Sequence, residues 1–142
     1  MRHPLKFFAV GLPKAQPRAR ARACGRFAQV YNPKTADDWK TIVRNECQNA
    51  WDGVQWQGPL KVNILFVLKR PKSHFRAGGQ LKPTAPLWHT AKPDRDNLDK
   101  SVLDALTNLG VWGDDKQVCD GRIQKRYGPV PGCLIEIAEA VE

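Results

Sequence analysis

The chain has 142 residues, a length that fits one compact domain, and we expect a single domain over residues 1–142. Apolar residues make up 42% of the sequence, which excludes a disordered chain, and there is no run of about 18 apolar residues that could span a membrane. Lys and Arg total 23 against 14 acids, a net charge of +9. The N-terminal stretch meets Gly11 and Pro13 too early for a signal peptide, so we expect a cytoplasmic protein.

The charges are segregated along the chain. Residues 1–36 carry eight Lys or Arg and no acid, and residues 53–93 carry seven and no acid. Seven aspartates then fall between Asp94 and Asp120. A basic chain that gathers its carboxylates into one stretch indicates a polyanion-binding surface around a local metal site.

The first third of the chain predicts a strand, a basic loop and a helix. Residues 5–12 are expected to form the strand, which Pro13 ends. Residues 13–34 mix prolines with basic residues, which predicts an irregular loop with a short strand at residues 27–31. A helix is expected from Thr35 to Ala50, capped by Thr35 with Asp38 at its third position.

Residues 60–68 begin with alternation and become apolar throughout, which predicts a strand inside a sheet. Residues 69–93 are rich in proline, glycine and basic residues and have no periodicity. Loops of this length in compact domains tend to be functional or mobile.

The remaining elements complete an α+β domain. Residues 97–109 show the clearest helical periodicity, and Gly110 suits the position after the helix. Residues 116–127 and 133–140 are predicted to be strands that pair with each other in antiparallel fashion. The expected order is β-α-β-loop-α-β-β, a mixed sheet with helices packed on it.

Aspartates lie at both ends of the predicted second helix. Asp94 and Asp96 are two residues apart in an extended approach to that helix, so their side chains can converge on one ion. Asp114 and Asp115 follow the helix, and a chain that folds back would bring Asp115 beside the first pair. The sequence permits this convergence without fixing it.

These residue types suit magnesium chemistry on a phosphodiester. Mg²⁺ prefers oxygen ligands and keeps several waters, so two or three of the four carboxylates suffice, and Mn²⁺ is a substitute ion. A bound ion can orient the phosphodiester and lower the pKa of an attacking water. Lys100, four residues after Asp96, could neutralise the anionic transition state or polarise the nucleophile.

Each of these residues also has a purely structural interpretation. Asp96 could cap the helix in a capping box with Asp99. Asp114 and Asp115 could form an ordinary turn pair. Lys100 could form a surface ion pair with Asp104, four residues later.

Two long stretches of the sequence resemble the RusA-like Holliday junction resolvases. Those enzymes carry D-x-D-N-x-x-K at the start of a helix, then an aspartate pair followed by x-Q-V; the chain has KPDRDNLDKSVLDAL at residues 92–106 and GVWGDDKQV at residues 110–118. Residues 13–18 and 25–35 are similar to the family's P-K-x-R-P-R and Y-x-P-K-T stretches, although Gln16 stands where arginine is common. The resemblance covers roughly residues 9–126.

The resemblance implies a homodimeric, Mg²⁺-dependent enzyme that nicks four-way DNA junctions in recombination and repair, often encoded by phages or prophages. Asp94, Asp96 and Asp115 match the family's essential acids, and Lys100 matches its catalytic lysine. Asp114 matches the first member of the aspartate pair. A two-fold dimer would supply two equivalent sites for paired nicks in opposed strands.

Basic residues outside the motif are candidate contacts to DNA phosphates, with a solvated charged loop as the alternative. They are Lys14, Arg18, Arg20, Arg22, Arg26, Lys69, Arg70, Lys72 and Arg76. Trp88 and His89 precede the motif and could pack under the site or stack on a base.

Two other functions remain open from the sequence. A nuclease for forks, flaps or phage packaging intermediates would have the same acidic site. A non-catalytic nucleic-acid-binding protein would have the same basic surface and dispensable aspartates.

Overall fold

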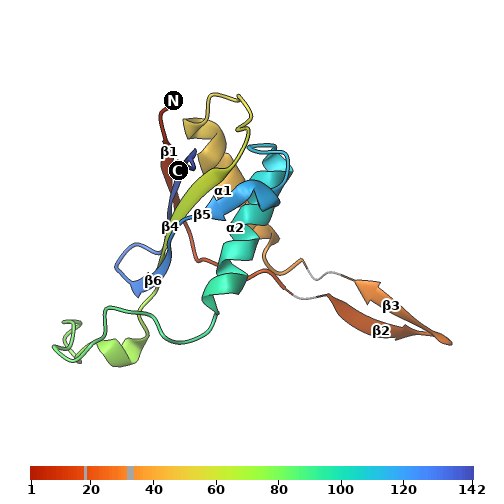
Figure 1. The fold of residues 1–142 in the computed structure, drawn as a ribbon. Coiled ribbons are helices and arrows are strands. Elements are labelled where there is room, and N and C mark those ends of the chain that lie inside the picture. Colours follow the sequence, from red (N-terminus) through yellow and green to blue (C-terminus); the bar gives the residue numbers. More distant parts are fainter. Residues whose placement is uncertain (18, 32–33) are drawn as a thin grey trace.

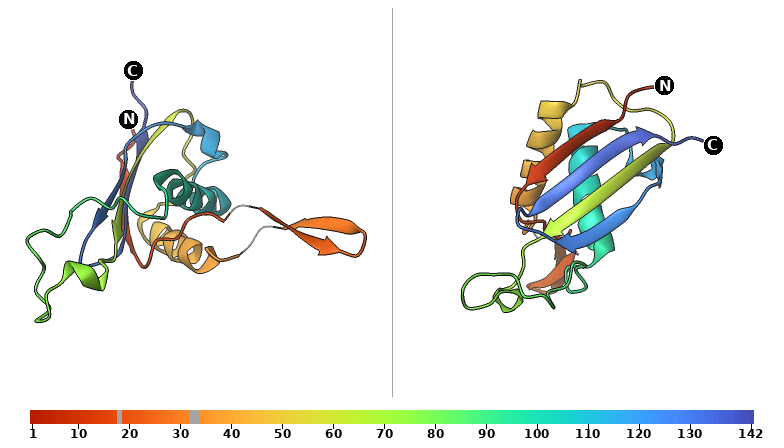
Figure 2. Two further views of the ribbon diagram at one scale, coloured as in Figure 1. Left: turned by 90° about the horizontal axis from the view of Figure 1, so that it is seen from below. Right: turned by 90° about the vertical axis from the view of Figure 1, so that its left-hand side faces the viewer.

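The computed structural model describes residues 1–17, 19–31 and 34–142. Two helices cover one face of a five-stranded sheet, and a two-stranded hairpin projects away from this body (Figure 1, Figure 2). The helices are α1 (Asp37–Ala50) and α2 (Arg95–Leu109), with short 3-10 turns η1 (Lys72–His74) and η2 (Asp115–Gln117). The strands are β1 (Leu5–Val10), β2 (Arg20–Cys24), β3 (Phe27–Tyr31), β4 (Leu60–Leu68), β5 (Val118–Asp120), β6 (Ile123–Tyr127) and β7 (Gly132–Glu139).

The α+β class and the mixed sheet with helices on it are as predicted, but one strand pairing is wrong. The order is β1-β7-β4-β5, with β6 also pairing with β4, so β4 separates β6 from β7. β7 is antiparallel to both β1 and β4, whereas β5 and β6 are parallel to β4. The reason is burial: β7 contributes the fully buried Cys133, Ile135 and Ile137 and takes a central position, while the half-buried β6 stays beside the edge.

The core lies between the sheet and the two helices. β4 alternates strictly, with Leu60, Val62, Ile64, Phe66 and Leu68 buried beneath the helices. Three tryptophans are almost fully enclosed in the same core: Trp39, Trp56 and Trp112. Neither long helix, of 14 and 15 residues, has the length or apolarity that crossing a bilayer would require.

The predicted cap of the first helix is wrong. α1 begins at Asp37, its N-cap residue is Ala36, and no side chain caps it. Asp38 instead accepts a hydrogen bond from the backbone N–H of Trp39 and two from Lys14 Nζ. The N-cap position falls on Ala36, so Thr35 and Asp38 do not form a capping box.

The short strand expected at residues 27–31 is present as β3. It pairs with β2 in register from Arg20↔Tyr31 to Cys24↔Phe27, and the hairpin extends well beyond the helices (Figure 1). We call this hairpin, formed by β2 and β3, the arm. It projects from the body of the protein and does not fold onto it (Figure 1).

The long loop between β4 and α2 returns along the sheet edge. Its last part, residues 87–93, which we call the strap, runs beside β6: Tyr127 N–H donates to Leu87 O at 2.8 Å and His89 N–H donates to Lys125 O at 3.2 Å. The strap leads directly into Asp94, so the loop fixes the entry to α2.

Candidate active site

The start of α2 is held in place by a lysine from the neighbouring strand. Lys125 Nζ donates hydrogen bonds to Pro93 O at 2.7 Å and Ala91 O at 2.9 Å, and the Lys92–Pro93 peptide is cis. Burial lowers the pKa of Lys125, the charge of Asp94 opposes that shift, and Arg95 adds to it. Lys125 thus lies within the electrostatic reach of Asp94 and anchors the strap that carries it.

Asp94 and Asp96 occupy the first turn of the helix. Asp94 takes the N-cap position without a side-chain cap bond, and Asp96 lies in the first turn. The interpretation of Asp96 as an N-cap is therefore wrong. Both side chains are exposed, so their oxygens are accessible to an ion or a substrate.

The turn after α2 is organised around Gln117. Its side-chain oxygen accepts from the N–H groups of Gly113 at 2.9 Å and Asp114 at 3.2 Å. Its amide nitrogen donates to Trp56 O at 3.2 Å and Gly58 O at 3.0 Å. The glutamine side chain therefore ties the turn that carries the aspartate pair to the segment before β4.

The two aspartates of the pair have different surroundings. Asp114 caps η2 by accepting from Lys116 N–H at 2.9 Å, and this bond is the main cause of the lowered pKa of Asp114. Its interpretation as a turn residue is confirmed. Asp115 begins η2, which packs beside α2, and its side chain is half-buried.

Asp99 lies between Asp96 and Asp115 in the sequence, and the charges of both act on it. It is half-buried on α2, and its pKa is raised to about 6, first by burial, then by the charge of Asp115, with Asp96 adding a smaller effect. Arg95 and Lys100 oppose the shift. The charge of Asp115, which follows the helix, and that of Asp96, in its first turn, thus both act on Asp99.

Asp99 is the acidic residue that sequence reasoning missed, because it was considered only as a capping-box partner. Its spacing of three residues from Asp96 places both on one face of the helix, which was the available signal. Lys125 was missed as well, because nothing in the sequence of β6 indicates which segment it contacts.

The aspartate carboxylates at the start of α2 and in η2 are oxygen ligands of the kind that a hard divalent cation binds. In the structure, however, they do not converge on one point. Within the described ranges, no three acidic, histidine or cysteine side chains are close enough to hold a metal ion. Carboxylates that crowd without a cation repel one another, and Mg²⁺ needs only one or two direct carboxylates because it keeps several waters. The negative charge that acts on Asp99 therefore favours a cation nearby, and the fit rests on the chemistry of the carboxylates.

Lys100 is paired within its own helix. Its Nζ lies 3.3 Å from a carboxylate oxygen of Asp104, so the predicted surface ion pair is confirmed. Lys40 Nζ lies 3.9 Å from the other oxygen of that carboxylate. The side chain of Lys100 is 60% exposed, which leaves it free to exchange this partner for a substrate.

The predicted phosphate contacts fall into two groups. In and near the arm, Lys14 pairs with Asp38 at 2.7 Å and Arg22 donates to Gln29 at 3.1 Å. Arg26 is exposed at the hairpin turn, Arg20 lies in β2, and Arg18 lies outside the described residues. In the long loop, Lys69, Arg70 and Lys72 line a hollow beside the strap, and Arg76 is exposed.

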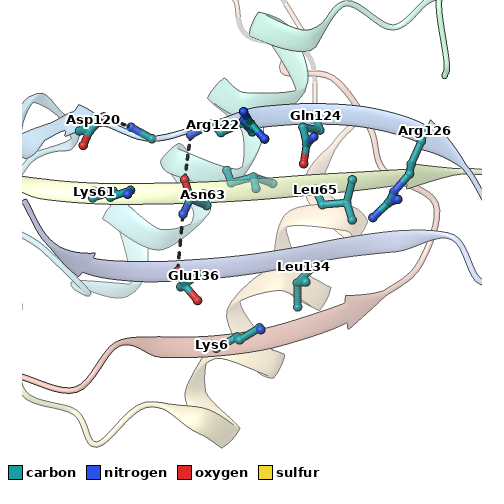
Figure 3. A pocket seen from close by; sticks show the side chains of 12 residues that line it. Lys6, Lys61, Asn63, Leu65, Asp120, Arg122, Gln124, Arg126, Leu134 and Glu136 are labelled. Carbon is teal, nitrogen blue, oxygen red and sulfur yellow. Dashed lines mark hydrogen bonds between the residues drawn. The ribbon is translucent and has the colours of Figure 1, made fainter.

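Trp88 and His89 point to opposite faces of the sheet. His89 is 8% exposed and packs against Tyr127, so its packing role is confirmed. Trp88 is 51% exposed and pairs with Arg126, which lies on the face away from the helices (Figure 3). Packing of Trp88 under the site was therefore a wrong expectation.

A larger hollow, of about 640 Å³, lies on that uncovered face of the sheet. Its lining includes Lys61, Arg122, Arg126 and Glu136, and Asn63 bridges Glu136 and the backbone of Arg122 (Figure 3). The sheet separates it from the buried face of β4 on which α2 packs. The hollow thus takes no part in the acidic site.

The family model described as endodeoxyribonuclease RusA matches residues 11–138. The chain belongs to this family. The protein YqaN of Bacillus subtilis (strain 168) is 28% identical over 137 residues, covering 95% of this chain and 96% of YqaN. The crossover junction endodeoxyribonuclease RusA of Escherichia coli (strain K12) is 56% identical over 32 residues, 22% of this chain and 27% of that enzyme.

The enzyme of the same name from Enterobacteria phage 82 matches with the same identity and coverage. The chain therefore aligns with about a quarter of these two named nucleases and with nearly all of YqaN. Membership of this family makes the chain an endodeoxyribonuclease.

Proposed function

We propose that this protein is a Mg²⁺-dependent, structure-specific endodeoxyribonuclease that resolves four-way DNA junctions by paired nicks and acts as a homodimer. The observation that carries the proposal is that η2, which begins at Asp115, packs beside α2, whose first turn holds Asp96. The electrostatic coupling of Asp99 to Asp96 and Asp115 supports a shared negative region in a chain whose net charge is +9.

Asp94, Asp96 and Asp115 would hold the metal, with Mn²⁺ as a substitute. Bound Mg²⁺ supplies a Lewis acid for the phosphodiester and lowers the pKa of a coordinated water. Asp99 adds negative charge that favours a cation at this position. Asp114 caps η2 through Oδ1, so in this proposal Asp115 is the ligand that the aspartate pair supplies.

Other residues of the chain position the substrate and stabilise charge. Lys100 can leave Asp104 and approach a phosphate oxygen that gains charge in the transition state. Lys125 keeps Asp94 at the helix start through the carbonyl groups of the strap. The arm and the long loop supply cations for phosphates on separate arms of a junction.

A homodimer explains how one acidic site per chain could produce two nicks. A two-fold axis presents the same site to both of the opposed strands of a junction. Sedimentation at micromolar protein, with and without junction DNA, tests this part; a species that stays monomeric on DNA contradicts it.

The activity is tested by comparing four-way junctions, forks, flaps and linear duplex of matched sequence in Mg²⁺. We expect cleavage of the four-way junction at symmetric positions and none in EDTA. Asp96→Asn should abolish cleavage and retain junction binding. Asp37→Asn, an exposed aspartate in the first turn of α1, is the matched control and should cleave normally.

Preference for forks or flaps over four-way junctions would reassign the protein to other branched DNA. Binding without nicks in Mg²⁺ or Mn²⁺, unchanged by Asp96→Asn, would make it a non-catalytic binding protein.

A further inference from the structure

A second hollow lies beside the strap, between the end of β4 and the end of β6. It has a volume of about 460 Å³, and Lys69, Arg70, Lys72, His89 and Tyr127 contribute to its lining. This volume is within the range of about 300–1,000 Å³ typical of ligand sites.

The hollow is on the same face of the sheet as the acidic site. Lys125 and Tyr127 are two residues apart on β6, so their side chains share a face, about 7 Å apart along the strand. Lys125 binds the strap immediately before Asp94. A DNA strand with its scissile phosphate at the aspartates would therefore pass close to the hollow.

The lining is rich in cations that no acid neutralises. Residues 53–93 contain no acidic residue. The salt bridges formed by the described part of the chain include neither Lys69 nor Lys72. Both lysines are exposed, and their ammonium groups can turn into the hollow.

His89 provides an unsatisfied polar atom at the same place. The residue is 92% buried, and its enclosed Nδ1 has no hydrogen-bond partner among the residues that the structure describes. Burial, with a smaller effect of Lys125, lowers the pKa of His89, so the ring is neutral at pH 7. A neutral imidazole has one N–H, which can donate to an anionic oxygen.

Tyr127 is already packed on several sides, which argues against a stacked base. His74 meets its ring edge-on with centroids 4.7 Å apart, and His89 lies at 4.9 Å. The guanidinium of Arg70 lies 5.4 Å from its centroid and donates to Pro86 O at 2.7 Å. Tyr127 and Arg70 therefore form the wall of the hollow, and the free donors belong to the lysines and His89.

We propose that this hollow is a phosphate subsite for the cleaved strand, occupied by a backbone phosphate near the scissile one. Lys69 and Lys72 neutralise the phosphate, and the imidazole of His89, which also lines the hollow, donates its N–H to one of the phosphate oxygens. The proposal rests on the proposed function for the direction of the DNA, and it narrows the phosphate contacts of the long loop to one position, next to the scissile phosphate on the cleaved strand.

The test replaces single phosphates of a junction by neutral methylphosphonates, one position at a time along the strand that is cut. Binding is measured by fluorescence anisotropy in Ca²⁺, which is expected to hold the complex without cleavage. In the wild type, one position within a few nucleotides of the scissile bond should weaken binding roughly tenfold, the scale of one charge-assisted hydrogen bond.

The same position should lose its effect when the hollow is altered. Lys69→Gln with Lys72→Gln should bind the native and the methylphosphonate junction equally, and His89→Gln should reduce the difference. Lys82→Gln, in the same loop but outside the hollow, should keep the full difference. The lysine variants change exposed side chains, so they test the subsite even where a change at buried His89 prevents folding.

A methylphosphonate penalty that persists in the double lysine variant overturns the subsite. So does a wild type that shows no penalty at any position near the cut. Where no nick is observed, all four strands are scanned and positions are numbered from the branch point. Binding is read without cleavage, so these outcomes do not depend on whether Mg²⁺ supports nicking, which tests the proposed function.

Discussion

Lys125 Nζ lies 2.7 Å from the carbonyl oxygen of Pro93, the residue that precedes Asp94. A charged side chain on one strand thereby fixes the backbone that delivers the first acidic residue of the site. The contact joins segments 32 residues apart in sequence.

Lys125→Met should therefore impair cleavage more than binding. The variant keeps the apolar stem of the side chain but loses both bonds to the strap, so Asp94 is no longer held. We expect kcat to fall by roughly ten- to a hundredfold, as small misplacements at active sites do, with little change in KM. Steady-state cleavage of a four-way junction measures both; an increase in KM alone would mean that Lys125 contacts DNA instead.

Gln117→Ala should destabilise the protein and lower its activity. The side chain makes four hydrogen bonds that hold the turn before Asp115, and alanine makes none. We expect a loss of about 2 kcal/mol in the free energy of unfolding, measured in urea. Gln117→Glu keeps the accepting oxygen, so its free energy of unfolding should lie between those of Gln117→Ala and the wild type. Equal stability of all three proteins would show that Gln117 does not hold the turn in place.

The structure explains why the acidic motif was predictable and its supports were not. The helix periodicity after Asp94 and the family motif lie within one continuous stretch, so local spacing was sufficient. Gln117 and Lys125 act through carbonyl groups tens of residues away, which spacing does not reveal. The pairing of β6 with β7 failed for a related reason: proximity in sequence favoured it, but the apolar β7 takes the central position between β1 and β4.

Lys100 illustrates the limit of a motif match. Its position agrees with the family's catalytic lysine, yet the folded chain pairs it with Asp104. Asp104→Asn removes that partner and should leave cleavage active, or raise it up to a few fold, because Lys100 is freed. Initial cleavage rates check this, and a loss of activity to the level of Lys100→Ala would show that the ion pair positions the lysine.

The apo protein should lose stability as the pH rises from about 4 to 7. The pKa of Asp99 is about 6 in the folded chain against an ordinary value of 3.8, so the folded state binds the proton more tightly than the unfolded state. Its contribution is favourable at low pH and is lost as the pH rises through about 6. After allowance for solvent screening we expect a loss of about 1–2 kcal/mol, absent in Asp99→Asn. Urea unfolding at intervals of pH in EDTA measures it, and parallel curves for the two proteins would contradict it.

Mg²⁺ should reverse that loss at neutral pH, because a cation relieves the repulsion among the carboxylates. An ion that binds only the folded state raises the free energy of unfolding by RT ln(1 + [L]/Kd), about 2.7 kcal/mol at a hundred times Kd. Asp96→Asn and Asp115→Asn should abolish the Mg²⁺-dependent rise in melting temperature. Asp114→Asn should retain it, since asparagine can still accept the bond from Lys116 N–H that caps η2. Thermal unfolding with and without Mg²⁺ distinguishes the role of Asp114 from that of Asp115. Loss of the rise in Asp114→Asn, with its retention in Asp115→Asn, would exchange their assigned roles.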